Sequence, residues 1–240
     1  MRYAIIAAGE GSRLAAEGIQ VPKPLVRVGG ERLIDRLIRI FMDNQAEEIV
    51  VICNDQTAQV AQHLVNIQRD GLRGRPVPLR FVVKSTPSSM HSFYEISKYL
   101  QDKQFILTTV DTIFHEHEFS DFVKVFSNSV IDGLMGITDF IDDERPLFVE
   151  VTPTMDITAF KDEKASCRYI SAGIYGLRDS AIFTLHNCIA RSEKRMRNFQ
   201  RALIADGRRL QAYPFSKVLD IDHASDIQKA EEFINETYDK

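Results

Sequence analysis

The stretch AAGEGSRLAAEGIQVPKPL, from Ala7 to Leu25, decides the fold. It follows a short apolar run, Tyr3 to Ile6, which is typical of a buried β-strand, and two glycines come directly after it. A glycine-rich turn behind a first strand is common in open α/β sheets, which bind ligands at the carboxyl ends of their strands. Arg13 follows the glycines, and Lys23 comes ten residues later between two prolines. The stretch therefore predicts a strand, a binding loop and two cations beside it.

The loop has the composition of a phosphate site. Gly9 and Gly11 permit a sharp turn whose backbone N–H groups can surround phosphate oxygens. Arg13 adds a forked cation and Lys23 a point charge, and both suit phosphate. A P-loop is excluded, because the P-loop lysine follows a glycine directly and Lys23 follows a proline. The dinucleotide fingerprint is excluded, because it needs a third glycine where this chain has Leu14. On its own, the loop could equally be a plain strand-to-helix turn with exposed basic residues.

Strands and helices alternate over the first half of the chain. Apolar residues at helical spacing and continuous β-branched runs favour a mainly parallel sheet with helices on both faces. The predicted strands are 48–54, 79–84 and 105–110, and the predicted helices are 31–44, about 57–67 and about 92–100.

The rhythm changes after Asp111. The runs MGITDF, LFVEVT, ITAF and RYISAGIYGL predict several strands with few helices between them, as a mixed or antiparallel extension of the sheet. The remaining predicted elements are helices within about 180–205, strands 210–214 and 218–222, and a helix from 224 to about 237. We expect one domain over residues 1–240, with a nucleotide-binding half (about 1–115) and an acceptor-binding half (about 116–240).

Composition narrows the class of protein. The 240 residues carry a net charge of −4, which argues against a dedicated nucleic-acid partner. Residues 1–40 nevertheless hold seven basic and four acidic residues, which fits a small anionic ligand near this end. The three cysteines are widely spaced, which predicts free thiols in a reducing compartment. With no apolar run long enough for a membrane helix and no signal peptide, we expect a cytoplasmic protein that does not bind membranes.

Taken together, AAGEGSRL, VPKPL and the apolar helix behind them resemble the signature of nucleotidyltransferases that join a nucleoside triphosphate to a phosphorylated acceptor, such as the sugar-1-phosphate nucleotidylyltransferases. The resemblance implies a Rossmann-like three-layer α/β sandwich with a mainly parallel mixed sheet, of the GT-A-like nucleotide-diphospho-sugar transferase type. It also implies that the glycine loop and Arg13 hold the triphosphate, and that Lys23 contacts phosphate oxygens at the reacting centre. Ala8 stands where many members have glycine.

Later segments resemble the family in the family's order. ILTTVDTIF resembles the strand whose aspartate binds magnesium, which nominates Asp111. SAGIYGL resembles the segment that lines the sugar pocket, and FKDEKA faintly resembles a segment whose lysine reaches the acceptor phosphate. VLDIDHASDIQKAEEF resembles the segment with a second metal-binding aspartate. The acceptor-binding residues thereby implied are Lys164, Ser171, Ala172 and Gly173.

The second metal ligand is ambiguous, because one alignment of this last segment selects Asp220 and another selects Asp222. In a strand over 218–222 both side chains would share one face, about 6.5–7 Å apart. Asp222 is also placed to cap the last helix. We therefore expect Asp111 and Asp220 to bind Mg²⁺, with Asp222 as a helix cap or an outer partner. The run HEHE at 115–118 is more typical of a solvated turn before a helix than of a metal site.

The base and the acceptor stay open. STPSSMHS, at 85–92, occupies the place of the base-reading loop of hexose-1-phosphate members, and the longer segment from Thr86 to Leu100 looks somewhat like one in cytidylyltransferases acting on phosphocholine. A cytidine nucleotide is favoured. The expected nucleotide-binding residues are Ala7, Ala8, Gly9, Glu10, Gly11, Ser12, Arg13, Lys23, Ser89, His91 and Ser92, and the expected catalytic residues are Arg13, Lys23 and Asp111.

Two other classes of function remain as alternatives, and the oligomeric state stays open, a homo-oligomer included. A nucleotide-sugar-dependent glycosyltransferase would normally carry Asp-x-Asp where this chain has Val110, Asp111 and Thr112. A non-catalytic regulatory relative would tend to lose Arg13, Lys23 or Asp111, and all three are present. A magnesium-dependent nucleotidyltransferase is therefore the expected function.

Overall fold

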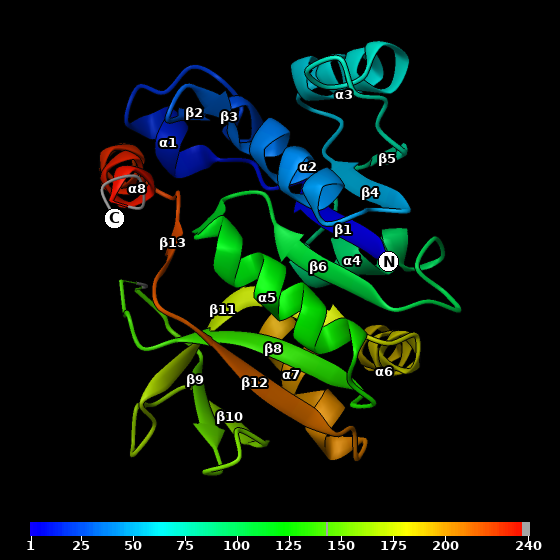
Figure 1. The fold of residues 1–240 in the computed structure, drawn as a ribbon, viewed down its shortest axis with the longest axis vertical. Helices are drawn as coiled ribbons and strands as arrows, with labels where there is room; N and C mark the ends of the chain where they lie inside the picture. The colour runs from blue at the N-terminus through cyan, green and yellow to red at the C-terminus, as the bar shows by residue number, and fades with distance from the viewer. Residues whose placement is uncertain (143, 237–240) are drawn as a thin grey trace.

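The computed structural model describes residues 1–142 and 144–236 of the chain. At its centre is a nine-stranded mixed sheet with helices on both faces (Figure 1). Its main path runs in the order β10, β9, β11, β6, β1, β4, β5, and β8 and β12 branch from β11. The predicted three-layer α/β sandwich with a mixed sheet is confirmed.

The first half of the chain forms the parallel part of this sheet. The first strand, β1 (Arg2–Ala7), lies between β4 (Glu48–Cys53) and β6 (Phe105–Thr109), and β5 (Leu79–Val83) extends the sheet beyond β4. All three pairings are parallel. The carboxyl ends of β1, β4 and β6 therefore meet at one edge, where the loop after β1 begins.

The second half adds antiparallel strands. The long strand β11 (Tyr169–Leu177) has β8 (Gly133–Thr138) on one side; on the other side it pairs with β9 (Phe148–Val151) at its beginning and with β6 at its end, and all three pairings are antiparallel. Beyond these lie β10 (Ile157–Lys161), antiparallel to β9, and β12 (Leu210–Phe215), parallel to β8. The predicted mixed extension therefore continues the first sheet.

Seven helices of nine or more residues in the described part of the chain cover the two faces of the sheet. Alternate residues of β1 point to opposite faces, so Tyr3 and Ile5 join one core cluster and Ala4 and Ile6 join the other. The helices whose buried residues belong to the first cluster are α2 (Leu33–Asp43), α3 (Ala58–Asp70), α5 (Glu116–Ser127) and α8 (Ala224–Asn235). Those of the second cluster are α4 (Ser89–Ser97), α6 (Ser180–Ala190) and α7 (Met196–Ala205).

Short elements frame the loop after β1. They are α1 (Ser12–Ala16), the 3₁₀ turn η1 (Lys23–Leu25) and the hairpin of β2 (Arg27–Val28) and β3 (Glu31–Arg32). The C-terminal segment returns to this region. There β13 (Val218–Asp220) pairs with β7 (Thr112–Phe114), and the Gly29 backbone N–H donates to Glu231 Oε1 of α8 at 3.1 Å.

Several boundaries differ from the prediction for physical reasons. The helix expected from residue 92 begins at Ser89, because the Ser88 hydroxyl accepts a hydrogen bond from the His91 backbone N–H and caps it. The strand expected over 218–222 ends at Asp220. The last helix ends at Asn235, and the expected end near Thr237 lies outside the described residues.

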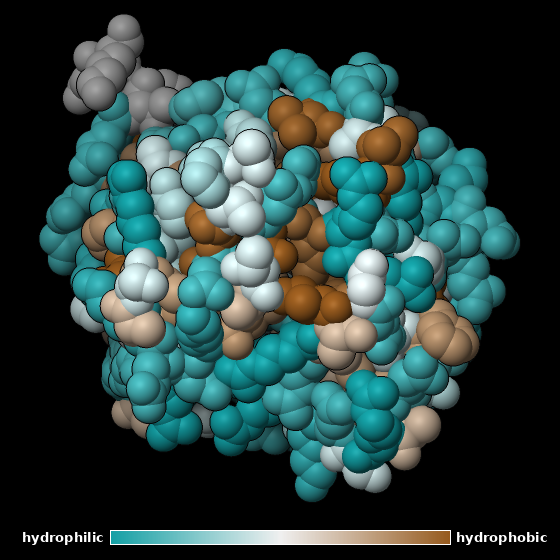
Figure 2. All heavy atoms as spheres, turned by 90° about the horizontal axis from the view of Figure 1, so that it is seen from below, coloured by the Kyte–Doolittle hydropathy of each residue, from teal (hydrophilic) through white to brown (hydrophobic). Residues whose placement is uncertain are grey.

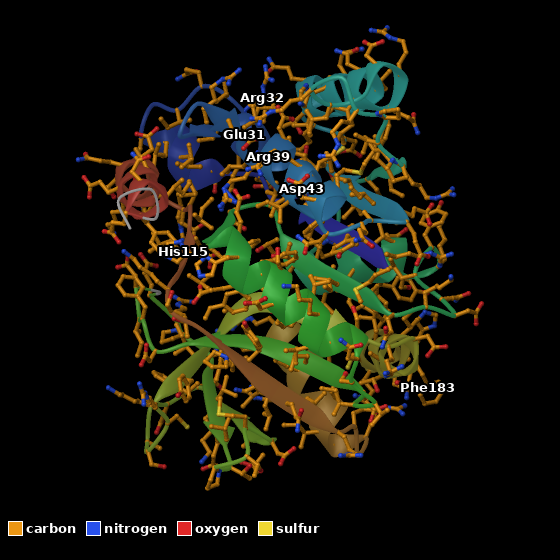
Figure 3. All side chains as sticks on the ribbon, in the orientation of Figure 1. Glu31, Arg32, Arg39, Asp43, His115 and Phe183 are labelled. Atoms are coloured by element: carbon orange, nitrogen blue, oxygen red, sulfur yellow. The ribbon has the colours of Figure 1, made fainter. Side chains whose placement is uncertain are left out.

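The expectation of a solvated turn at HEHE is wrong. Glu116 starts α5 and pairs with Arg39 of α2, at 2.8 Å from Oε1 to Nη2, and the His115 ring packs at a tilt of 45° against the Phe233 ring of α8, with centroids 4.1 Å apart. Figure 3 shows Arg39 between Glu31 and Asp43 along α2. The HEHE segment thus joins α5 to α2 and α8.

The face seen from below in Figure 2 is mostly hydrophilic, with hydrophobic side chains gathered toward its centre. Within residues 1–142 and 144–236, none of the helices combines the length and the apolar character needed to cross a membrane.

Candidate active site

The loop after β1 turns around Gly11. This residue has φ +63°, a left-handed conformation that disfavours side chains, and a Cβ added to it would lie 3.1 Å from the Lys23 Cβ. The buried side chain of Asn54, at the end of β4, supports the loop by donating to the carbonyl oxygens of Ala8 (3.4 Å) and Gly9 (3.3 Å). The loop and Lys23 are therefore held close together by the backbone itself.

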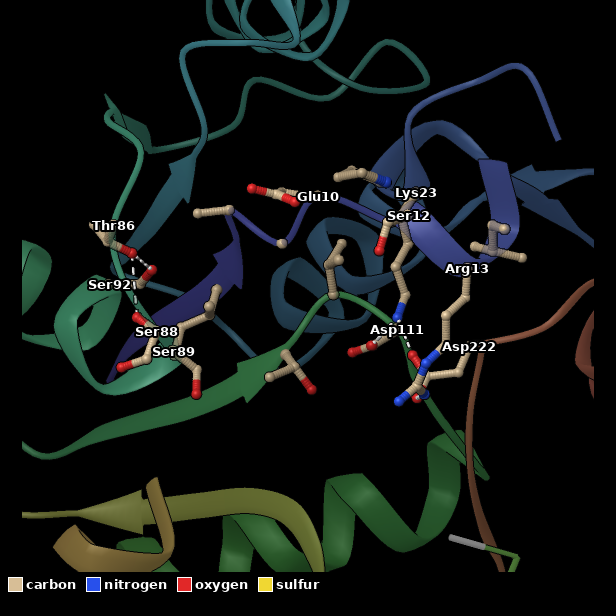
Figure 4. Close-up of a pocket in the computed structure, with 18 of the residues that line it drawn as sticks. Glu10, Ser12, Arg13, Lys23, Thr86, Ser88, Ser89, Ser92, Asp111 and Asp222 are labelled. Carbon is tan, nitrogen blue, oxygen red and sulfur yellow. Dashed lines mark hydrogen bonds and ion pairs between the residues drawn. The ribbon is translucent and has the colours of Figure 1, made fainter. Parts of the chain in front are cut away.

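A first cavity of about 450 Å³ opens at this edge of the sheet. It is bounded by the glycine loop on one side and by the start of α4 on the other (Figure 4). The polar or charged side chains that line it are Glu10, Ser12, Arg13, Lys23, Thr86, Ser88, Ser89, Ser92, Thr109, Asp111 and Asp222. A volume of this size is typical of small-molecule sites.

Lys23 is the centre of a charged cluster at the border of this cavity. Its Nζ contacts Asp111 Oδ2 and lies 2.7 Å from Asp222 Oδ1. Arg13 Nη1 donates to the other Asp222 oxygen at 3.0 Å. Figure 4 shows these side chains converging from the loop, the end of β6 and the segment before α8. The structure thus brings Arg13, Lys23 and Asp111 together, as expected from their motifs.

Charge and burial oppose each other at Lys23. The Lys23 side chain is 11% exposed and that of Asp111 is 18% exposed. Burial alone would lower the pKa of Lys23, but the Asp111 and Asp222 carboxylates outweigh it and hold the pKa above its ordinary value. Burial likewise opposes the charged form of Asp222, yet hydrogen bonding to Lys23 lowers the pKa of this carboxyl. Lys23 is therefore a firmly charged cation between two carboxylates.

Asp222 does not cap the last helix, so the first of its two expected roles, helix cap or outer partner, is wrong, and the second stays a prediction. The residue before the helix is His223, whose backbone N–H donates to the Asp226 carboxylate at 2.8 Å and whose carbonyl oxygen accepts from the Asp226 backbone N–H at 3.0 Å. Glu17, directly after α1, accepts from the Ala224 backbone N–H at 2.6 Å and contacts the His223 ring. The start of α8 is thereby fixed against the glycine-loop region, with Asp222 facing the cations.

Asp220 lies opposite Thr112 in the pairing of β13 with β7. Although its side chain is exposed toward a neighbouring cavity, desolvation by the surrounding protein and repulsion by the Asp111 carboxylate raise the pKa of Asp220 above its ordinary value. Asp111, Asp220 and Asp222 thus concentrate negative charge around Lys23. Within residues 1–142 and 144–236, no three His, Cys, Asp or Glu side chains are arranged as a metal site.

A second cavity of about 440 Å³ adjoins the first, and both are lined by Arg13 and Asp222. Ser171 and Ala172, two of the residues expected to bind the acceptor, line it. Its other charged side chains are Asp142, Glu144, Arg145, Asp220, His223, Asp226 and Lys229. The charged cluster around Lys23 therefore lies where two cavities meet.

Four expected residues line neither cavity in the described part of the chain. Ala7 is buried at the end of β1, and the His91 ring pairs with the Ser88 hydroxyl at 2.9 Å. Lys164 lies in an exposed loop after β10. Gly173, at φ +71°, lies where the register between β11 and β8 shifts. This left-handed glycine lets β11 change direction beside Ser171.

Sequence reasoning missed Thr86, Ser88 and Thr109 as lining residues of the first cavity. Thr86 and Ser88 stand in the quoted STPSSMHS run, and a polar residue just before Asp111 at a strand end was a readable signal for Thr109.

Comparison with known proteins identifies the class. A family model described as "Nucleotidyl transferase" matches residues 3–237. The chain belongs to the nucleotidyl transferase family. The expected family is thereby confirmed.

Individual relatives are distant. The chain is 27% identical over 163 residues (68% of this chain, 32% of the relative) to a "Bifunctional IPC transferase and DIPP synthase" of Thermococcus kodakarensis. It is 24% identical over 237 residues (96% of this chain, 43% of the relative) to the protein of the same name from Archaeoglobus fulgidus. The chain thus spans less than half the length of these two curated relatives.

Two solved structures share the fold over nearly the whole chain. The inositol-1-phosphate CTP transferase from T. maritima has a TM-score of 0.79 and 19% identity, with 98% of this chain and 96% of that chain covered. A putative glucose-1-phosphate thymidylyltransferase from Bacillus anthracis has a TM-score of 0.84 and 18% identity, with 98% and 95% covered.

Proposed function

We propose that this protein transfers a nucleoside monophosphate from a nucleoside triphosphate to a small phosphorylated acceptor and releases pyrophosphate. The observation that carries the proposal is the pair of adjoining cavities with Lys23, Arg13 and Asp222 at their border. A triphosphate in the first cavity would place its α-phosphate near Lys23, with the acceptor approaching from the second cavity. Such a border is where the reacting phosphates must meet.

The chemistry requires positioning and positive charge more than a protein nucleophile. An acceptor phosphate oxygen attacks the α-phosphorus in line, the bond to the β-phosphate oxygen breaks, and pyrophosphate leaves. The loop N–H groups around Gly9 and Gly11 would orient the triphosphate, and Arg13 would neutralise its charge. Lys23, buried and firmly protonated, would stabilise the charge that builds up on the phosphoryl oxygens in the transition state.

The carboxylates fit a magnesium ion. Mg²⁺ takes oxygen ligands and binds through one or two protein carboxylates together with substrate phosphates. We propose Asp111 and Asp222 as these ligands, because both contact the same Lys23 Nζ and Asp222 is free of the capping role. Asp220, preferred from the sequence, would act from the outer shell beside Thr112. When bound, the ion would supply positive charge to the phosphates.

We propose CTP as the donor and a sugar or inositol phosphate as the acceptor. The T. maritima structure with the same fold is named an inositol-1-phosphate CTP transferase, and Thr86 and Ser92 offer small hydroxyl groups at the far end of the first cavity. A phosphocholine acceptor is disfavoured, because trimethylammonium sites use open aromatic faces. Phe140 is the single Phe, Tyr or Trp among the described residues lining the second cavity, and Lys217 Nζ lies 4.9 Å from its ring centre.

The test is a matrix of ATP, CTP, GTP and UTP against glucose 1-phosphate, inositol 1-phosphate and phosphocholine, with Mg²⁺ and with pyrophosphate release as the readout. We expect release only when a triphosphate and an acceptor are both present, and the most with CTP and a sugar or inositol phosphate. Triphosphate hydrolysis without an acceptor, or sugar transfer from a nucleotide sugar, would refute the proposed reaction.

A further inference from the structure

A buried glutamine lies behind the second cavity. Gln200 of α7 is 2% exposed, although its side chain is an amide with four hydrogen-bonding positions. Burying such a group is costly unless both ends of the amide are bonded. Its two ends are satisfied by β11, because Oε1 accepts from the Ser171 hydroxyl at 3.0 Å and Nε2 donates to the Tyr175 hydroxyl at 3.4 Å.

Ser171 connects this glutamine to the second cavity. The side chain of Ser171 lines the cavity, and its backbone N–H donates to the Leu147 carbonyl at 2.8 Å. A hydroxyl has one proton to donate and two lone pairs. Since the proton of Ser171 is directed to Gln200, the hydroxyl can present only a lone pair to whatever occupies the cavity.

The surroundings hold the side chains of this network in place. Tyr175 is buried, and burial raises the pKa of its hydroxyl to about 12, so this group stays protonated and neutral. The side chain of Gln200 cannot turn away from the two hydroxyls, because it is enclosed between its own helix, α7, and β11 with almost no exposed surface. A shifted register of β11 between Ser171 and Tyr175 places both hydroxyls on the same amide.

We propose that Gln200 is a positioning residue of the acceptor site: it holds the Ser171 hydroxyl as a hydrogen-bond acceptor, which selects an acceptor molecule that presents a hydroxyl donor at this point. The inference rests on the proposed function, since the second cavity must hold the phosphorylated acceptor. Gln200 itself does not line the cavity and acts through Ser171.

The test compares Gln200→Met, Ser171→Ala and the double variant in steady-state kinetics with CTP and whichever of glucose 1-phosphate and inositol 1-phosphate the wild type uses. Each single variant should raise the acceptor KM about tenfold, the size of one lost hydrogen bond. The double variant should be no worse than either single one, because both remove the same interaction. The KM for CTP should stay within about twofold of wild type, since the nucleotide occupies the other cavity.

Thr184→Val is the matched control. Thr184 is also a fully buried polar residue, and its hydroxyl donates to Asp206 Oδ2 at 2.6 Å, but it belongs to α6 and lines neither cavity. It should leave the acceptor KM unchanged. If Gln200→Met fails to fold, Ser171→Ala together with the shorter Gln200→Asn makes the same comparison.

The outcomes separate the two claims. An unchanged acceptor KM in the variants, additive effects in the double variant, or an equal rise in the KM for CTP would overturn the role of Gln200 while the proposed function stands. A wild-type protein that transfers nothing to any phosphorylated acceptor would overturn the proposed function and this inference with it.

Discussion

Replacing Lys23 with methionine removes the cation between Asp111 and Asp222. The Lys23 and Asp111 side chains are 11% and 18% exposed, so both charges have lost most of their water. Removing one partner of a fully buried ion pair costs about 3–5 kcal/mol, and we expect about 2 kcal/mol here because Asp111 still opens into the first cavity. For a domain of this size, that free energy lowers Tm by about 4–8 °C.

The assay is thermal unfolding at neutral pH with EDTA present, followed by the rate of pyrophosphate release with Mg²⁺. Arg13→Ala is the matched control, because the Arg13 side chain is 52% exposed and its loss should change Tm little. Both variants should lose activity by about a hundredfold or more. Adding Asp111→Asn to Lys23→Met should restore part of the lost Tm without restoring activity. The reasoning fails if Lys23→Met melts at the wild-type temperature, or if the double variant melts no higher than Lys23→Met alone.

Gly11→Ala should cost about 1–2 kcal/mol of stability, because alanine disfavours φ +63° and its Cβ would crowd Lys23. Gly9→Ala is the comparison, because a Cβ at Gly9 meets no atom within 4 Å. Equal melting temperatures for the two variants would contradict this. Glu116→Gln should lower Tm at pH 7, because the ionised Glu116 carboxylate is hydrogen-bonded to Arg39, which lowers its pKa. The difference in Tm from wild type should shrink as the pH falls below about 4.5, because the wild type then loses this stabilisation. A difference in Tm that does not depend on pH would argue against the ion pair of Glu116 with Arg39. Calorimetric titration with MgCl₂, after subtraction of the heat of Mg²⁺ binding to CTP without protein, should give binding heat only when CTP is present, because Lys23 otherwise holds the carboxylates. Asp222→Asn should abolish this remaining heat, and full binding by this variant would remove Asp222 from the ligand set.

The sequence predicted those parts of the site whose residues are close together along the chain. Gly11, Arg13 and Lys23 belong to one short stretch, whose resemblance to the family signature predicts a phosphate loop. Asp111 was nominated by the resemblance of ILTTVDTIF to a family segment, and its position after a buried strand supports this, because strand ends gather at one edge of a parallel sheet. The core strands were likewise predicted from local apolar runs.

Features that depend on tertiary contacts could not be predicted in the same way. Whether Asp222 caps α8 or faces Lys23 depends on how residues 218–236 return to the glycine loop, which no local pattern encodes. Glutamine is a common residue type at exposed helix positions, so the burial of Gln200 becomes evident only from the packing of α7 against β11. The start of α5 was expected too late, because the HEHE run was interpreted as a turn before the helix, whereas Glu116 already belongs to it.

The bond between Arg13 and Asp222 joins residues 209 positions apart. Closing a loop of that length costs entropy that is recovered only when the intervening sheet and helices are already packed. During folding, the strands of the central sheet can therefore assemble before the charged cluster does, and a chain with native secondary structure can still lack its anion site. Refolded protein should regain its circular dichroism signal earlier than its capacity to bind a triphosphate, so that ligand binding reports the last step by which the two ends of the chain come together.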